Sequence, residues 1–373
     1  TMDVIDKATK EEEARKDDKP WPITKEVAAQ FACEVFGLSG IDITKVKEFV
    51  SYDDRNFFLP AVTYTNAETC VTETLDVIFK VHNGVESDQP LLIGAHNAVL
   101  SHLIKEGVNV PEPLAVKQGG DKIGWIKLQR LGQPTTMRSH AVRLLRYLPG
   151  LVIDQRQEEK PELLHDLGAF IGNMDHKLRL LPEVPVGLAG RVLLWDLTHV
   201  PALERFSSSI VDASNRALQQ QVIARFNHLV VPKLPSLRRA VIQNDANEQN
   251  VLIDETRSHV TGIIDFGDCL HTCLIFELAI CIAYMMLGKK DPMGTAASIY
   301  KGYLTQMDLT ADEKEILPCL VAARLVQSVT MGAYSHGKDP TNEYLLLTAK
   351  TGWEALRICT SITEPHFLER LEQ

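Results

Sequence analysis

Apolar and polar residues alternate differently in the two halves of the chain. Before Pro149 the apolar runs are short and strand-like, and the clearest is Thr74–Val81, which ends L-D-V-I-F-K-V. After Pro161 apolar residues recur at helical spacing over long segments. Strands gathered in one part and helices in the other predict an α+β fold with two lobes, an antiparallel sheet with a helix followed by a mostly helical lobe.

The first part also contains helical and turn signals. Thr24 can cap and Gly37 can end a short amphipathic helix. The further elements that we expect are a helix at Leu91–Glu106 and strands at Lys122–Leu131 and His140–Leu148. The last strand runs into Pro149-Gly150. There we place the boundary between an N-lobe, residues 21–149, and a C-lobe, residues 150–373.

Six segments of the second part have helical periodicity: Glu162–Leu180, Leu203–Leu218, Gln221–Val231, Leu274–Leu287, Ala311–Tyr334 and Glu343–Thr360. Leu274–Leu287 is the longest apolar run, but it is too short to span a bilayer and contains Glu277. We therefore expect a buried helix there. At the other end of the chain, Lys7–Lys19 is so rich in charge that we expect residues 1–20 to form a disordered tail.

Composition limits the classes of function. The 373 residues are 45% hydrophobic and 24% charged, which suits a globular protein with two cores. The net charge of −10 argues against a nucleic-acid partner. Seven scattered cysteines without a C-x-x-C pair favour reduced thiols and a cytoplasmic location, with no membrane anchor. Nothing in the pattern indicates an oligomeric state.

The stretch Val241–Asp268 carries the clearest chemistry. It contains two apolar strand-like pieces, Val251–Ile253 and Val260–Ile264, with polar residues at their edges. A strand, a turn and an antiparallel return would bring Asn250 and Asp265 to one end of a hairpin. Amide and carboxylate oxygens converging there suit Mg²⁺ shared with phosphates. Asp245 remains to take a proton from a substrate hydroxyl. The alternative is that these are ordinary loop and turn residues.

The order of these residues carries a family resemblance. Asp245-x-x-x-x-Asn250 followed by I-D-F-G-D resembles the catalytic core of kinase-like phosphotransferases, and most closely the aminoglycoside and choline kinase branch. The resemblance implies that Asp245 is the catalytic base. It also implies that Asn250 and Asp265 hold Mg²⁺, and that GTP or ATP is the co-substrate.

Lys80 lies inside the apolar strand Thr74–Val81. A buried lysine is costly unless its ammonium is paired, and the resemblance implies that Lys80 contacts phosphates. A lysine whose ammonium extends to water from an edge strand is the alternative. A kinase would place a glutamate in the following helix to pair with it. The register points instead to His96, so either His96 or Asn97 orients the lysine or phosphate alone does. His96 could equally be a helix-surface residue.

Two further segments are expected to contact the nucleotide. Ser51 and Asn56 belong to a polar turn, without G-x-G-x-x-G, that would lie over the phosphates. Arg146, Tyr147 and Leu148 form the expected hinge, whose backbone amides would meet the base.

Several stretches outside these motifs resemble one group within the family, the hydroxylysine kinases. They are S-Y-D-D-R-N-F at Ser51–Phe57, V-R-L-L-R-Y-L-P-G at Val142–Gly150, a looser match at Trp195–Leu203, and A-Y-S followed by Y-L-L-L-T-A-K-T-G-W at Tyr344–Trp353. The resemblance covers nearly the whole chain from about Ile23. It implies phosphate transfer, described for this group as using GTP, to the 5-hydroxyl of free hydroxylysine.

One departure affects the catalytic loop. The family usually has His-Gly-Asp where this chain has Gln243-Asn244-Asp245. Gln243 keeps a donor and an acceptor, so we expect activity to survive, at a reduced level.

A hydroxylysine substrate is a small zwitterion with an extra ammonium group. Asp268 and Glu277 are the candidates for its ammonium groups, Lys350 or Arg324 for its carboxylate, and Trp353 for an apolar wall. For Glu277 the alternative is a core residue paired with a cation, and for the others surface charge or core packing.

Two other readings remain open. The acceptor could be choline, ethanolamine, homoserine or an aminoglycoside. The chain could also be a nucleotide-binding protein with weakened catalysis, because Gln243 and His96 replace the usual residues.

Overall fold

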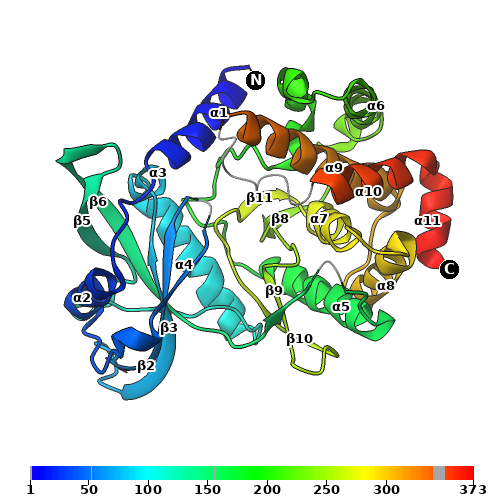
Figure 1. Ribbon diagram of the computed structural model, residues 1–373. Helices are drawn as coiled ribbons and strands as arrows, with labels where there is room; N and C mark the ends of the chain where they lie inside the picture. The colour runs from blue at the N-terminus through cyan, green and yellow to red at the C-terminus, as the bar shows by residue number, and fades with distance from the viewer. Residues whose placement is uncertain (1, 52, 155–156, 339–348) are drawn as a thin grey trace. The chain divides into compact units, whose positions relative to one another are not determined.

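The computed structural model describes residues 2–51, 53–154, 157–338 and 349–373 (Figure 1). These residues form two compact units. The first unit comprises residues 1–149 and Glu183–Arg191, and the second comprises Gly150–Pro182 and Val192–Gln373. The division falls between Pro149 and Gly150, where the strand pattern ends, but the first unit also takes a short segment from later in the chain.

The first unit is built on one antiparallel sheet of six strands in the order β1-β2-β3-β6-β4, with β5 paired to β6. Its strands are β1 (Lys47–Phe49), β2 (Arg55–Thr65), β3 (Thr72–Val81), β4 (Pro113–Leu114), β5 (Gly124–Arg130) and β6 (Gln133–Arg146). Its helices are α1 (Met2–Asp17), α2 (Lys25–Phe36), η1 (Ile43–Lys45), α3 (Gly84–Ser87) and α4 (Pro90–Lys105). The predicted helices at 24–37 and 91–106 are confirmed, with Thr24 capping α2 and Gly37 ending it in the left-handed conformation.

Strand alternation gives the sheet two different faces. Phe57, Val77 and Phe79 point into an apolar core that α2 covers through Ala32 and Phe36. Because successive side chains of a strand point to opposite faces, Lys80 lies on the other face. There Asn56 of β2 and Arg143 of β6 are its cross-strand neighbours. The sheet therefore separates a hydrophobic core from a charged face.

The first twenty residues differ from the expected tail. Met2–Asp17 forms helix α1, drawn in dark blue in Figure 1. Its lysines, glutamates and alanines are good helix formers, and Ile5 and Ala8 are buried. Arg15 lies 3.9 Å from Glu86, and Asp18 just beyond the helix accepts a hydrogen bond from Arg138. Charge density alone suggested disorder because these partners are distant in sequence.

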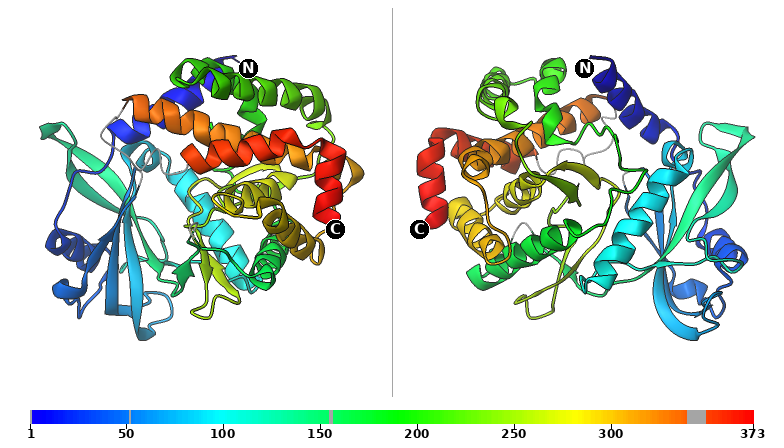
Figure 2. Two further views of the ribbon diagram at one scale, coloured as in Figure 1. Left: turned by 45° about the vertical axis from the view of Figure 1, so that its right-hand side comes forward. Right: turned by 180° about the vertical axis from the view of Figure 1, so that it is seen from behind.

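The second unit is mainly helical. Its helices are α5 (Pro161–Leu178), η2 (Leu197–Ser209), α6 (Ala213–Leu229), η3 (Val231–Lys233), α7 (Ile275–Met285), α8 (Pro292–Leu304), α9 (Ala311–Lys338), α10 (Ala349–Ser361) and α11 (Glu364–Glu372). Its strands are β7 (Leu151–Val152), β8 (Arg239–Ile242), β9 (Val251–Ile253), β10 (Val260–Ile263) and β11 (Leu270–Cys273). They form two small sheets, β10-β9-β7 and β11-β8. Helix α10 packs on α9, and α11 packs on α8 and α9 (Figure 2).

The predicted helices at 203–218 and 221–231 have wrong boundaries. The first is divided between η2 and α6, because Asp212 caps a new helix, and α6 continues into the second. Helices α8 and α11 were missed, although Asp291 before Pro292 is an ordinary start signal for α8. The start of the expected helix at 343–360 lies outside the described residues.

Helix α9 is unusually long and apolar. Over Ala311–Gly337 it is long and apolar enough to cross a membrane, but 83% of its most apolar window is buried inside the protein. That burial is what a core helix shows. The seven cysteines all lie among the described residues, and none of them forms a disulfide there.

Candidate active site

The loop from β8 to β9 begins with a strained turn. Ile242 ends β8, and Asn244, two residues later, adopts φ +68°. Asparagine is among the few non-glycine residues that enter this left-handed region readily. Asn244 can therefore adopt at this position a conformation that otherwise favours glycine. After β10, Asp265 has φ +56° and makes the second sharp turn.

Asp245 is held by the two asparagines that follow it. The Nδ2 atoms of Asn250 and Asn247 donate to Asp245 Oδ2 over 2.8 and 2.9 Å. Asn250 Nδ2 also donates to the Asp245 carbonyl over 2.9 Å. Because the amide nitrogen of Asn250 is turned toward Asp245, its oxygen is left as an acceptor.

The β9-β10 hairpin brings Asn250 and Asp265 to the same end. Ile263 pairs with Val251, and the Ile264 amide donates to the Asn250 carbonyl over 2.9 Å. Asp265 is exposed, and its Oδ1 accepts from the Gly267 amide over 3.0 Å. This amide and carboxylate are hard oxygen donors of the kind that Mg²⁺ prefers, so the two residues fit that ion.

Gln243 links the two turns. Its Nε2 donates to the carbonyls of Asp265, over 2.6 Å, and Ile264, over 3.2 Å. Its Oε1 accepts from the Asp245 amide over 2.7 Å. One fully buried side chain thus ties the Asp245 loop to the Asp265 turn. The amide uses both its donor and its acceptor capacity in this link.

Glu277 of α7 supports the loop from the core. Its Oε2 accepts from the backbone amides of Gln243, over 2.5 Å, and Asn244, over 3.1 Å. The side chain is fully buried, so it holds the loop in place of the expected contact with a substrate ammonium. Burial raises the pKa of Glu277 to about 7, although the two amides and the charge of Arg324 oppose the shift.

Arg324 of α9 lies beside Asp245. It is 1% exposed, and its Nη2 is 3.3 Å from both Asp245 Oδ1 and the Asn244 carbonyl. Its guanidinium lies 5.2 Å from the ring centres of Trp195 and Tyr284. The sequence suggested Arg324 for a substrate carboxylate, and the structure gives this buried cation to the catalytic loop. Desolvation raises the pKa of Asp245 well above its ordinary value, helped by Asp268 and Asp265 and opposed by Arg324.

In the first unit, Lys80 is paired with Asp54, whereas the sequence suggested His96, Asn97 or phosphate alone. Its Nζ is 2.6 Å from Asp54 Oδ2, and both side chains are nearly buried. Asp54 Oδ1 accepts from the Asn83 amide over 2.7 Å and from Asn83 Nδ2 over 3.1 Å. Burial would raise the pKa of Asp54, but the charge of Lys80 lowers it below its ordinary value. The two groups therefore form a buried ion pair.

Asp54 of this pair also lies near His82 and Glu86, and the three side chains are close enough together to suggest a metal site. Their hydrogen bonds argue against one. Arg143 Nε donates to His82 Nε2 over 2.9 Å, so the ring proton is on Nδ1, which lies 2.7 Å from Glu86 Oε2. Since Asp54 already holds a lysine and Glu86 holds His82, the cluster is a hydrogen-bonded charge network.

His96 is neither a surface residue nor a partner of Lys80. It is completely buried in α4, and neither ring nitrogen has a hydrogen-bond partner among the described residues. Burial and the charges of Arg191 and Arg143 lower its pKa well below the ordinary value, so the ring is neutral. Asn97 is also turned elsewhere and accepts from Arg143 Nη1 over 3.1 Å.

Two of the three backbone amides of the expected hinge are already hydrogen-bonded within the protein. The amides of Arg146 and Tyr147 donate to the carbonyls of Glu112, over 2.8 Å, and Asp76, over 2.9 Å. Only the Leu148 amide has no acceptor among the described residues. The Arg146 side chain binds Glu73 and Glu112.

The other predicted residues lie on β2, on α10 and in two connecting segments. Ser51 is half-buried, and its carbonyl accepts from Lys19 over 3.2 Å. Asn56 Oδ1 is buried without a partner among the described residues, on the strand next to Lys80. Asp268 is half-buried after the Asp265 turn. On α10, Lys350 is exposed and Trp353 is half-buried.

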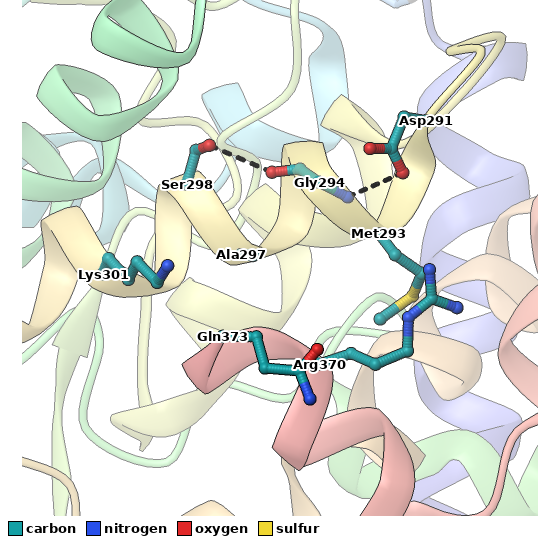
Figure 3. A pocket seen from close by; sticks show the side chains of 8 residues that line it. All are labelled: Asp291, Met293, Gly294, Ala297, Ser298, Lys301, Arg370 and Gln373. Carbon is teal, nitrogen blue, oxygen red and sulfur yellow. Dashed lines mark hydrogen bonds between the residues drawn. The ribbon is translucent and has the colours of Figure 1, made fainter.

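A cavity of about 320 Å³ lies elsewhere in the second unit, between α8 and α11 (Figure 3). Lys301 and Arg370 are among the residues that line it. The hydrogen bonds drawn there, from Gly294 to Asp291 and from Ser298 to Gly294, belong to the first turns of α8. None of the residues predicted from the sequence for the active site lines this cavity.

Comparison with known proteins agrees with this geometry. Residues 64–314 match the Phosphotransferase enzyme family. The hydroxylysine kinase of Mus musculus is 32% identical over 338 residues, 88% of each chain, and that of Xenopus laevis is 31% identical over 332 residues, 86% of each. A solved microcompartment-associated aminopropanol kinase, 17% identical, superimposes with a TM-score of 0.65 over 90% of this chain and 96% of its own. That likeness confirms the α+β, protein-kinase-like fold.

Proposed function

Because this chain belongs to the phosphotransferase enzyme family and phosphorylates an alcohol, we propose that it transfers the terminal phosphate of GTP or ATP to the hydroxyl of 5-hydroxy-L-lysine. The chain matches curated hydroxylysine kinases over most of its length and theirs. The single observation that carries the catalytic part of the proposal is the linked loop in which Gln243 joins the Asp245 turn to the Asp265 turn.

In this proposal Asp245 is the catalytic base. Asn250 and Asn247 hold one carboxylate oxygen, and Arg324 faces the other. A carboxylate fixed in this way can orient a substrate hydroxyl and accept its proton as the phosphate is transferred. The protein's contribution is then positioning and charge stabilisation more than covalent chemistry.

Asn250 and Asp265 are the residues that would hold Mg²⁺. The ion would neutralise charge on the nucleotide phosphates. Lys80 would contact the phosphates that are not transferred, and Ser51 and Asn56 belong to the segment proposed to lie over them.

The nucleotide base is assigned to the charged face of the first unit. Ile78 is half-buried. It lies two positions before Lys80 on β3, so the two side chains share that face of the sheet. Phe58 is the cross-strand partner of Ile78, and its ring centre is 4.6 Å from that of Tyr147. These side chains form an apolar patch next to the Leu148 amide, which suits a planar base. Backbone amides can read either a guanine or an adenine edge.

The substrate assignment uses residues of the second unit. Asp268 lies three residues beyond Asp265 and is proposed for a substrate ammonium. Lys350 and Trp353 lie three positions apart and so on one face of α10. Lys350 is proposed for the substrate carboxylate, and Trp353 for the wall against its aliphatic chain. Glu277 is left out of this set because the loop backbone occupies it.

Phosphate transfer to a panel of acceptors tests the proposal. Purified protein with Mg²⁺ and either GTP or ATP is offered 5-hydroxylysine, lysine, homoserine, choline, ethanolamine and an aminoglycoside, and the phosphorylated product is measured by mass spectrometry. Transfer to 5-hydroxylysine with the highest kcat/KM is expected, and lysine, which lacks the hydroxyl, controls for reaction at nitrogen. A higher kcat/KM on another alcohol would overturn the substrate assignment.

A catalytically weakened nucleotide-binding protein is the second candidate. The observation in its favour is that this chain lacks the usual histidine of the loop and has no acid in α4. Against it, Gln243 makes both halves of the link between the turns. A shift in melting temperature with Mg²⁺ and nucleotide, together with no turnover on any acceptor, would favour this second candidate.

A further inference from the structure

The kinase fold needs an acid beside the lysine of the third strand, and in this chain the usual source cannot supply one. Helix α4 reads P-L-L-I-G-A-H-N-A-V-L-S-H-L-I-K and contains neither aspartate nor glutamate. Its buried polar residues near the sheet, His96 and Asn97, make no contact with Lys80. The ammonium of a lysine that is 9% exposed must therefore be stabilised from another element.

Asp54 meets this requirement. It lies just before β2, and its Oδ2 is 2.6 Å from Lys80 Nζ. The register of the sheet explains the approach, because Arg55 pairs with Val81 and Asn56 with Lys80. The residue before Arg55 is thereby brought alongside the end of β3.

Asp54 is itself rigidly held. Its other oxygen accepts two hydrogen bonds from Asn83, which is fully buried and caps α3. A short carboxylate with three contacts, two from Asn83 and one from Lys80, has little rotational freedom. Its fixed position can therefore determine where the Lys80 amine lies.

The structure assigns Asp54 as the residue that positions Lys80, in place of an acid on α4. The assignment rests on the proposed phosphotransferase function for its effect on catalysis. The position of the lysine then depends on Asp54, which belongs to the segment proposed to lie over the phosphates. In this chain the pairing of Lys80 does not require a charge from α4.

A double-mutant cycle tests the assignment. Asp54→Asn should lower kcat by about 10- to 100-fold, because misplacing a catalytic cation by about 1 Å has costs of this size. Lys80→Met should lower it at least as much. If Asp54 acts through Lys80, the double variant should be no slower than Lys80→Met alone. Additive losses would overturn the assignment.

Matched controls separate positioning from folding. Asp42→Asn changes an exposed aspartate of the first unit that caps η1 through the Thr44 amide, so its kcat should stay close to that of the wild type. His96→Gln changes the buried histidine of α4 and should also retain activity. Asp54→Glu keeps the charge and should recover part of the rate. Equal losses in the Asp42 and Asp54 variants would contradict the assignment.

A measurement without nucleotide keeps this inference separate from the proposed function. Acetylation of Lys80 in the unliganded protein, measured by mass spectrometry of its peptide, should be faster in Asp54→Asn than in the wild type and unchanged in Asp42→Asn. If the wild type transfers no phosphate but this difference is found, the proposed function fails and the pairing stands. An unchanged acetylation rate in Asp54→Asn, with a wild-type melting temperature, would refute the pairing itself.

Discussion

The catalytic loop of the second unit and the lysine cluster of the first unit depart from their family pattern in different ways. In the loop, the residue types change but the contacts are kept. Gln243 stands where the family usually has histidine and links the two turns, and Asn244 stands where it usually has glycine and adopts a left-handed conformation. In the cluster, the contact is kept but its source changes, because Asp54 replaces an acid on α4.

Two buried glutamates, Glu277 beside the loop and Glu86 in the cluster, have pKa shifts in opposite directions. Glu277 supports the loop through backbone amides, and burial raises its pKa to about 7. Glu86 is equally buried, and burial alone would raise its pKa. Its hydrogen bond with His82 and the charges of Arg15 and Lys80 instead hold the pKa of Glu86 well below the ordinary value. The difference lies in the partners: an acid against backbone dipoles can be neutral, whereas one among cations stays charged.

The largest effect should come from Asp245→Asn. The variant keeps the shape of the side chain but cannot accept a proton, so kcat should fall by about a hundredfold or more. Steady-state kinetics with saturating GTP or ATP and the preferred acceptor measure this. Asp254→Asn is the matched control, because Asp254 lies in the same hairpin but caps its turn through the Ser258 and His259 amides. A rate near that of the wild type for Asp245→Asn would exclude the base role.

Opposite pH slopes should distinguish the two glutamates. Between pH 4.5 and about 7 the folded protein keeps a proton on Glu277 that the unfolded chain has released. The free energy of unfolding should therefore decrease as pH rises through this window, by about 3 kcal/mol. Glu277→Gln keeps an acceptor for the loop amides and should remove the share of this slope that comes from Glu277, leaving the share of other buried acids such as Asp245.

Glu86 should behave in the reverse sense. Because its folded-state pKa is lowered, its contribution to stability is present above its ordinary value of 4.5 and is lost as pH falls below it. Glu86→Gln should weaken the acid-side loss and leave the neutral window unchanged. Urea unfolding between pH 3.5 and 8 measures both slopes. Identical profiles for the two variants would contradict the difference in partners.

Gln243 offers a smaller effect on rate. Gln243→Leu removes both halves of the link between the turns, and kcat should fall by about tenfold or more because Asp245 is then positioned less well. Gln243→His restores a ring with a donor and an acceptor and should keep the rate close to that of the wild type. Equal losses in the two variants would show that the link does not matter to the rate.

The smallest effect should come from Asn244. At φ +68° an alanine should cost about 1–2 kcal/mol of stability, whereas glycine has no such penalty. Glycine also removes two side-chain atoms, Nδ2 and Oδ1, that are buried without partners among the described residues. Asn244→Gly should therefore be more stable than the wild type by about 1 kcal/mol. Denaturant unfolding compares the three proteins, and a glycine variant as unstable as the alanine variant would rule out backbone strain.

Much of the fold could be predicted from periodicity. The hairpin Val251–Ile263, the strand Thr72–Val81 and helices α2, α4 and α5 lie within a few residues of their expected positions. The regions that were mispredicted depend on distant partners or on single punctuating residues. Helix α1 was taken for a tail, and Asp212 starts a new helix inside one expected helix.

The sequence by itself determined the order of chemical groups, because the spacing of Asp245, Asn250 and Asp265 around two short strands leaves few ways to fold the ribbon. Only the tertiary structure decided which groups become partners. Lys80 is 26 residues from Asp54, and Glu277 is 34 residues from Gln243. Such pairings follow from strand register and helix packing, which bring together side chains whose separation along the chain carries no periodic signal.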